Sequence, residues 1–152
     1  LVCKNQSVKE SVMKFCQARL SPPLIGQVIA EASIDTPAEY MQEMYNEYLE
    51  RRNYLIEGLN KIPGVYSAVP MGAFYTVARL PIDDSDKFCA WLLSEFEYEK
   101  QTVMMAPASG FYTMKNVGCN EVRLAYVLNK EDLEKALFIL KKALEVYPGR
   151  TK

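Results

Sequence analysis

The 152-residue sequence contains no histidine, and this absence limits the chemistry that the chain can perform alone. It excludes Ser-His and Cys-His catalytic pairs and a histidine general base. Close pairs of metal ligands are also missing, because the four cysteines are widely separated and show no C-x-x-C spacing. We therefore expect no metal site, and we interpret Cys3, Cys16, Cys89 and Cys119 as reduced, mostly buried thiols of a cytosolic protein.

Long basic runs and long apolar runs are absent as well. Lys and Arg occur at most in adjacent pairs and the net charge is −1, so no track for nucleic-acid phosphates is expected. No apolar stretch approaches the roughly 20 residues that cross a bilayer, and no signal-peptide pattern opens the sequence. We predict a cytoplasmic protein without nucleic-acid or membrane partners. Because the sequence opens at Leu1 as if within a strand, we also expect a fragment or a trimmed chain.

The composition that remains is typical of a folded globular protein, with 49% hydrophobic and 24% charged residues. The length allows one domain with a real core, or a domain plus part of another. Neither an internal repeat nor a low-complexity tract is present.

Helical patterns occupy the first sixty residues. Residues 7–19 begin with an S-x-x-E capping box made by Ser7 and Glu10. A second helix is expected after a cap at Ser21, and its buried face should consist of Leu24, Val28 and Ala32.

A long third helix is predicted from the stretch "DTPAEY", which offers Thr36 as a cap, Pro37 at the first helical position and Glu39 in the first turn. The apolar spacing continues to about Lys61. A helix of about 25 residues spans nearly 40 Å, which is long enough to link two domains.

The second half alternates between strands and helices. "VYSAVPMGAFYTVARL", "QTVMMAP" and "EVRLAYV" contain the expected strands. One helix should be capped by Asp83 or Asp84, and the last should start at Asn129. We predict an α+β fold, in which a small mixed or antiparallel sheet has helices packed on one face and follows a helical segment and a long interdomain helix.

Arg123 is the candidate functional residue of this pattern. In "NEVRLAYV", Val122, Leu124 and Tyr126 share one face of a strand, whereas Arg123 lies on the other face beside an alanine and a valine. We expect that second face to be at least partly covered, and a guanidinium there needs an anion. A planar guanidinium can bind a carboxylate ligand through two parallel hydrogen bonds. An ion pair with Glu121, two residues away, is the alternative that the sequence leaves open.

Three further features are weaker candidates. In "PMGAFYTVARL", Phe74 and Tyr75 point to opposite faces, so at most one of them faces a ligand, and hydrophobic core is the alternative. Arg19 precedes a proline-stiffened turn that could present it outward, or it is simply a solvated arginine at a helix end. The loop at residues 106–112 could line a pocket or be an ordinary turn.

Several segments together resemble one enzyme family. "ARLSPPLIGQVIAEAS", "YLERRNYLIEGL", "PMGAFYTVARLP", "VMMAPASGFY" and "NEVRLAYV" occur in the order of the C-terminal part of class I/II aminotransferases. These are pyridoxal-phosphate (PLP) enzymes of fold type I, and the sequence is most similar to the bacterial aspartate aminotransferases. The resemblance covers essentially the whole chain.

The resemblance implies that Arg123 binds the α-carboxylate of an amino acid or 2-oxo acid substrate. It implies that Phe74 and Tyr75 lie near the mouth of the active site, and that "SPPLIGQ" reaches the neighbouring subunit of a homodimer. Arg19 is then a hypothesis for a side-chain carboxylate contact, although it is displaced by a few positions from the arginine of aspartate enzymes. The loop "APASGFY" departs from the family's P-G-x-x-F-G form, which leaves substrate preference open.

The family's Schiff-base lysine, its aspartate partner and its phosphate loop have no match in this sequence. Lys4 and Lys9 lack the expected context. Residues 1–35 are therefore expected to be a remnant of the large PLP-binding domain, and residues 36–152 the small domain. PLP is expected in the full-length enzyme and not on this chain, which we predict to have no catalytic residues and no transaminase activity by itself.

Two alternatives remain at this point. In the first, the chain is a non-catalytic small-molecule-binding or interaction domain that uses the same fold. In the second, the parent is a PLP enzyme with different chemistry, such as a β-lyase or a decarboxylase, since Arg123 would be retained in many of these.

Overall fold

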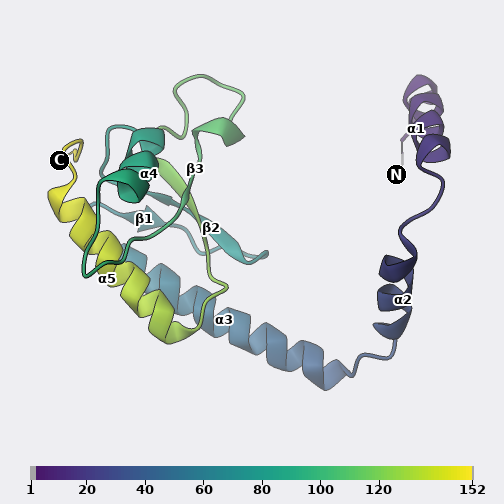
Figure 1. Ribbon diagram of the computed structural model, residues 1–152, viewed down its shortest axis with the longest axis horizontal. Helices are drawn as coiled ribbons and strands as arrows, with labels where there is room; N and C mark the ends of the chain where they lie inside the picture. Colours follow the sequence, from purple (N-terminus) through teal and green to yellow (C-terminus); the bar gives the residue numbers. More distant parts are fainter. Residues whose placement is uncertain (1–2, 152) are drawn as a thin grey trace. The chain divides into compact units, whose positions relative to one another are not determined.

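The computed structural model describes residues 3–151 (Figure 1). The chain divides into two compact units, with the division between Gln42 and Glu43. The elements in order are α1 (Gln6–Arg19), α2 (Leu24–Ala32), α3 (Ala38–Asn60), β1 (Tyr66–Ser67), β2 (Tyr75–Arg79), α4 (Ser85–Ser94), β3 (Ala106–Pro107), the short 3-10 helix η1 (Ser109–Phe111), β4 (Glu121–Ala125) and α5 (Lys130–Val146). This arrangement confirms the α+β fold class.

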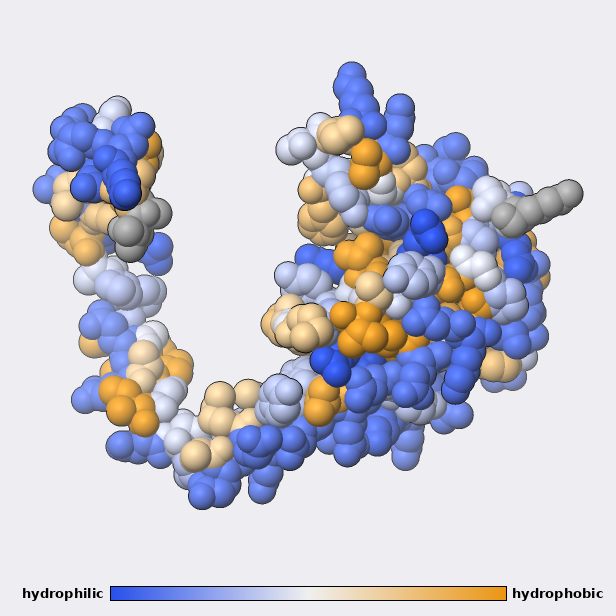
Figure 2. All heavy atoms as spheres, turned by 180° about the vertical axis from the view of Figure 1, so that it is seen from behind, coloured by the Kyte–Doolittle hydropathy of each residue, from blue (hydrophilic) through white to orange (hydrophobic). Residues whose placement is uncertain are grey.

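The first unit contains α1 and α2, and neither helix has a buried residue. Figure 2 shows hydrophobic spheres on the surface of these helices. The predicted buried face of α2 is therefore wrong, since Leu24 and Val28 are 75% and 56% exposed. The 3.6-residue spacing was correct, but an apolar stripe is buried only where another element covers it.

The caps of this unit also differ from the prediction. Asn5, rather than Ser7, caps α1, and its side-chain oxygen accepts a hydrogen bond from the backbone N–H of Val8 at 3.2 Å. In α2 the capping position is Pro23 and no side chain satisfies the helix start. Asn is as good a cap as Ser, so the capping box at Ser7 did not determine by itself where α1 begins.

The second unit is built on a four-stranded sheet with the order β1-β2-β4-β3, in which every neighbouring pair is antiparallel. The central pair is β2 and β4, with Val77 opposite Arg123 and Ala78 opposite Val122. β2 alternates strictly between exposed and buried residues. One face of the sheet therefore belongs to the core and the other is open.

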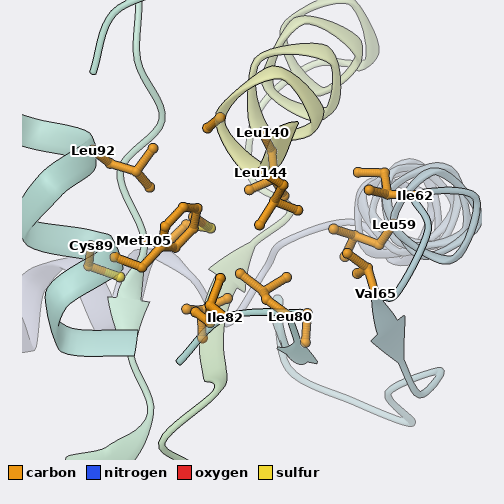
Figure 3. Close-up of a cluster of buried hydrophobic side chains, with 14 of the residues drawn as sticks. Leu59, Ile62, Val65, Leu80, Ile82, Cys89, Leu92, Met105, Leu140 and Leu144 are labelled. Carbon is orange, nitrogen blue, oxygen red and sulfur yellow. The ribbon is translucent and has the colours of Figure 1, made fainter. Parts of the chain in front are cut away.

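The core lies where three helices meet the closed side of the sheet. α3 contributes Leu55 and Leu59, which are at most 3% exposed, and α4 contributes Phe88 and Leu92, which are fully buried. In the close-up, side chains of α3, α4 and α5 meet side chains from the segments between the elements (Figure 3). The labelled members of this cluster are Leu59, Ile62, Val65, Leu80, Ile82, Cys89, Leu92, Met105, Leu140 and Leu144. All members of this cluster come from residues 55–147.

The predicted cysteine state is only partly right. All four thiols are free, but Cys89 alone is fully buried, while Cys16 is exposed and Cys3 and Cys119 are intermediate. Within residues 3–151, no helix is both long and apolar enough to cross a membrane.

Candidate carboxylate-binding site

The open face of the sheet carries the residues singled out in the sequence. From β2 it presents Tyr75, Val77 and Arg79, and from β4 it presents Glu121, Arg123 and Ala125. Period-two alternation places these side chains together, because a neighbour on the same strand is two residues away. Polar and aromatic groups thus gather over the centre of the sheet.

Arg123 lies between two aromatic rings. Its guanidinium carbon is 5.3 Å from the ring centroid of Tyr75 and 5.1 Å from that of Phe111. Each contact is worth about 0.5–1 kcal/mol at an exposed position, and together they restrict where the guanidinium points. One ring comes from the adjacent strand and the other from η1, so the fold rather than the local sequence builds this slot.

The expectation that this face is covered is wrong for the described chain, because Arg123, Ala125 and Val127 are all exposed. Small and apolar neighbours indicated coverage, but within residues 3–151 nothing packs on them closely enough to bury them. An exposed guanidinium keeps its hydration, so the folded chain does not require a partner anion there.

The alternative partner for Arg123 is engaged elsewhere. Glu121 accepts a hydrogen bond from the Tyr112 hydroxyl at 2.5 Å, and this bond raises the pKa of Tyr112 above its usual value. Across residues 3–151, no carboxylate comes within 4.0 Å of Arg123, and no hydrogen-bond acceptor contacts its guanidinium. Its five N–H donors are therefore available to a ligand.

A second arginine shares the face. Arg79 lies opposite Glu121 in the strand register, and its guanidinium is 5.7 Å from the ring of Tyr66. The face therefore carries two guanidinium groups and the Glu121 carboxylate, which accepts the Tyr112 hydroxyl. A planar carboxylate ligand can take two parallel hydrogen bonds from a guanidinium.

Of the other predicted residues, Tyr75 joins the site and Phe74 borders it. The two rings are 5.7 Å apart in an edge-to-face contact, and they are 42% and 54% exposed. Phe74 therefore supports the Tyr75 ring rather than the core. Arg19 is the last residue of α1, in the first unit, and its proposed contact stays a prediction.

Phe111 and Arg79 were missed as individual residues. The loop at 106–112 had been recognised as a possible pocket lining, and Phe111 belongs to it. Arg79 could have been found from its position two residues after Val77, on the face of β2 that Arg123 approaches. The larger hollows of the second unit lie elsewhere: one of about 470 Å³, largely apolar, runs between α5 and the segment 101–105.

The described residues do not by themselves fit a PLP cofactor. β2 and β4 carry no lysine, and three lysines of the second unit are paired with carboxylates: Lys130, Lys135 and Lys142. Within residues 3–151, no group of three metal-ligating side chains is found either. The Arg123 guanidinium can bind an anion, but β2 and β4 provide no lysine amine that could bind the aldehyde of PLP.

Comparison with known proteins identifies the family of this chain. The family profile "Aminotransferase class I and II" matches residues 1–140. The chain therefore belongs to the class I and II aminotransferase family.

Individual relatives agree with this assignment. An aspartate aminotransferase of Pyrococcus horikoshii is 36% identical over 107 residues, which are 69% of this chain and 25% of the relative. An aspartate aminotransferase of Rhizobium meliloti is 30% identical over 142 residues, which are 86% of this chain and 32% of the relative. The chain thus spans about a third or less of the curated relatives that it matches.

Solved structures share the fold. An alanine aminotransferase from Pyrococcus furiosus superposes with a TM-score of 0.73 at 27% identity, covering 91% of this chain and 35% of that one. The aspartate aminotransferase of Thermotoga maritima superposes with a TM-score of 0.68 at 28% identity, covering 86% of this chain and 31% of that one.

Proposed function

We propose that this chain is the substrate-carboxylate-binding part of an aspartate-type, PLP-dependent aminotransferase. The parent enzyme transfers an amino group between an amino acid and a 2-oxo acid, and this chain supplies its C-terminal region. Residues 1–35 belong to the large domain and residues 36–152 form the small domain. Family membership, the names of the sequence relatives and the order of the motifs support this proposal.

One observation carries the proposal at the level of chemistry. Arg123 is held between Tyr75 and Phe111 while its N–H donors are unoccupied by any residue of the described chain. An arginine that stabilised the fold would be expected to bond to its neighbours. Arg123 instead contacts two aromatic rings, and the edge of its guanidinium that can donate two parallel hydrogen bonds is available to a carboxylate.

The role of such a contact is orientation. Two parallel hydrogen bonds fix both the position and the rotation of the substrate α-carboxylate, which fixes the direction of the Cα–H bond at the reacting carbon. Positioning of this kind contributes several kcal/mol when the ligand is held in a productive geometry and water is excluded. Because Arg123 is exposed in this chain, the parent enzyme must cover the sheet face to obtain the full effect.

PLP supplies the electron sink for amine transfer in this family, and its lysine belongs to another part of the parent. The residues of this chain bind and orient the substrate. Phe74 and Tyr75 form the wall beside Arg123. Arg19 is proposed to contact a substrate side-chain carboxylate across the interface of a homodimer, and the parent is proposed to be cytoplasmic.

The proposal is tested in the parent protein, which carries this chain together with the lysine-bearing part. Arg123→Lys keeps the charge but removes the planar pair of donors, so kcat/KM for L-aspartate should fall by about 100-fold or more. Arg150→Lys is the control, since Arg150 is an exposed arginine outside the open face, and its guanidinium donates to the carbonyl of Leu144 at 3.2 Å.

The control variant should stay within about threefold of the wild-type value. Equal losses in both variants would show that the loss is not specific to Arg123, and an unchanged rate in Arg123→Lys would refute the assignment. A panel of amino acids with product analysis separates transamination from β-elimination and decarboxylation.

A further inference from the structure

Tyr126 makes an unusual set of contacts with the segment before β2. Its backbone N–H donates to the carbonyl of Phe74 at 3.0 Å, and its hydroxyl donates to the carbonyl of Ala73 at 2.8 Å. The same hydroxyl is 3.4 Å from the carbonyl of Gly72. One residue therefore engages three consecutive carbonyl groups, through both its main chain and its side chain.

The segment that Tyr126 contacts includes a residue with an unfavourable backbone conformation. Ala73 has a φ of 61°, in the left-handed region that residues with a Cβ seldom adopt. A conformation of this kind costs about 1 kcal/mol or more and persists where surrounding contacts enforce it. Arg52 of α3 adds a second anchor by donating to the carbonyl of Pro70 at 3.2 Å.

Tyr126 is suited to act as a fixed point. It is 2% exposed and packs in the core cluster, and it directly follows β4 in the chain. Burial raises the pKa of its hydroxyl, against a smaller opposing effect of Arg52. The hydroxyl therefore keeps its proton and remains a donor throughout the neutral range.

The supported segment leads directly into the candidate site. Phe74 and Tyr75 come next in the chain, and the Tyr75 ring is one of the two rings that hold Arg123. Arg123 lies in β4, and Tyr126 directly follows this strand, three residues later. One short stretch of chain therefore carries both the arginine of the candidate site and the residue that supports the backbone beside it.

We propose that Tyr126 is a positioning residue, which fixes the backbone at residues 72–74 and thereby holds the Tyr75 ring against Arg123. Its consequence for ligand affinity rests on the function proposed for Arg123. The structural part, that the Tyr126 hydroxyl sets the place of the Tyr75 ring, is independent of any ligand.

The test compares two tyrosine variants of the whole chain. Tyr126→Phe removes only the hydroxyl that bonds to Ala73. Tyr147→Phe is the matched control, because Tyr147 is also buried, at 8% exposure, and its hydroxyl donates one bond of 3.0 Å to Asp83, away from the segment at 72–74. Both variants should be destabilised to a similar, modest extent, which urea unfolding checks.

Two measurements respond only to the positioning role. In nuclear magnetic resonance spectra, Tyr126→Phe should weaken or abolish the cross-relaxation between the Tyr75 ring and the Arg123 side chain, and the amide of residue 126 should exchange faster. Tyr147→Phe should leave both unchanged. In titrations with succinate as a carboxylate probe, the dissociation constant should rise about fivefold in Tyr126→Phe alone.

The possible outcomes are separable. An intact Tyr75–Arg123 contact and unchanged exchange in Tyr126→Phe would overturn the positioning role. If Tyr126→Phe loses the Tyr75–Arg123 contact but binds succinate as tightly as the wild type, the proposed effect of Tyr126 on ligand affinity is overturned. If the wild-type chain itself fails to bind succinate at Arg123, the function proposed for Arg123 fails, while the ring contact still decides the structural claim.

Discussion

At the scale of single residues, burial strongly raises the pKa values of Cys89 and Tyr147 in the second unit. It raises the pKa of the Cys89 thiol to about 11, and the nearby Asp86 carboxylate adds to the shift. Burial together with the hydrogen bond to Asp83 raises the pKa of Tyr147 to about 12. Both groups hold a proton more tightly in the folded state than in the unfolded state.

The direction of the pH dependence follows from these shifts. Because both pKa values are raised on folding, the stability that these groups contribute is complete at neutral pH and declines as the pH rises above their ordinary values. The free energy of unfolding, measured with urea, should therefore fall between about pH 8 and about pH 11. Tyr147→Phe should make this fall shallower. A flat wild-type profile, or an unchanged slope in Tyr147→Phe, would contradict these shifts.

Residue-level prediction from the sequence succeeded where alternation alone decides. It placed Val122 and Tyr126 on the core face of β4 and Arg123 on the other face. It was wrong about the burial of Arg123, because the burial of a sheet face depends on which other segments pack on it. The sequence of the strand alone does not determine this. The ring of Phe111 reaches Arg123 from η1 through tertiary folding, which short-range patterns do not encode.

At the scale of elements, the helix starts in the second unit follow their capping residues. Asp84 caps α4 through a 3.0 Å bond from the N–H of Lys87, and Asn129 caps α5 through a 2.9 Å bond from the N–H of Asp132. Both caps were among those expected from the sequence. α5 also supplies much of the core, so its start is coupled to global stability.

A cap substitution tests that coupling. Asn129→Ala removes the side-chain acceptor at the start of α5 and should lower the free energy of unfolding of the second unit by about 1 kcal/mol. Asn5→Ala removes a cap of the same chemistry from α1, which has no buried residue, so the urea midpoint of the second unit should not change. Equal shifts in both variants would contradict the division into two units.

The elements differed in how far the sequence determined them. α4 and α5 begin with the side-chain caps expected from the sequence, and the apolar faces of α3, α4 and α5 all reach the core. The strands β1 and β3 are only two residues long, far shorter than the patterns around them, because pairing with β2 and β4 rather than propensity sets their ends.

At the scale of the whole molecule, the core is confined to the second unit. Its members lie between Leu55 and Tyr147, and unit one contributes none of them. A chain that begins at Glu43 should therefore keep the fold of the second unit and its urea midpoint, within the error of the measurement. A midpoint lowered by a large amount, or loss of the amide signals of β2 and β4, would show that residues 3–42 support the core.

The account depends most directly on carboxylate binding at Arg123, and one titration measures it. The isotope-labelled chain is titrated with L-aspartate and, as a control, with L-aspartate amidated at its α-carboxyl group, while the side-chain N–H signals of the arginines are followed. We predict that L-aspartate shifts the Arg123 signal in a saturable way, that the amide does so much more weakly, and that Arg123→Gln abolishes binding. Equal binding of both ligands, or undiminished binding to Arg123→Gln, would contradict the central claim.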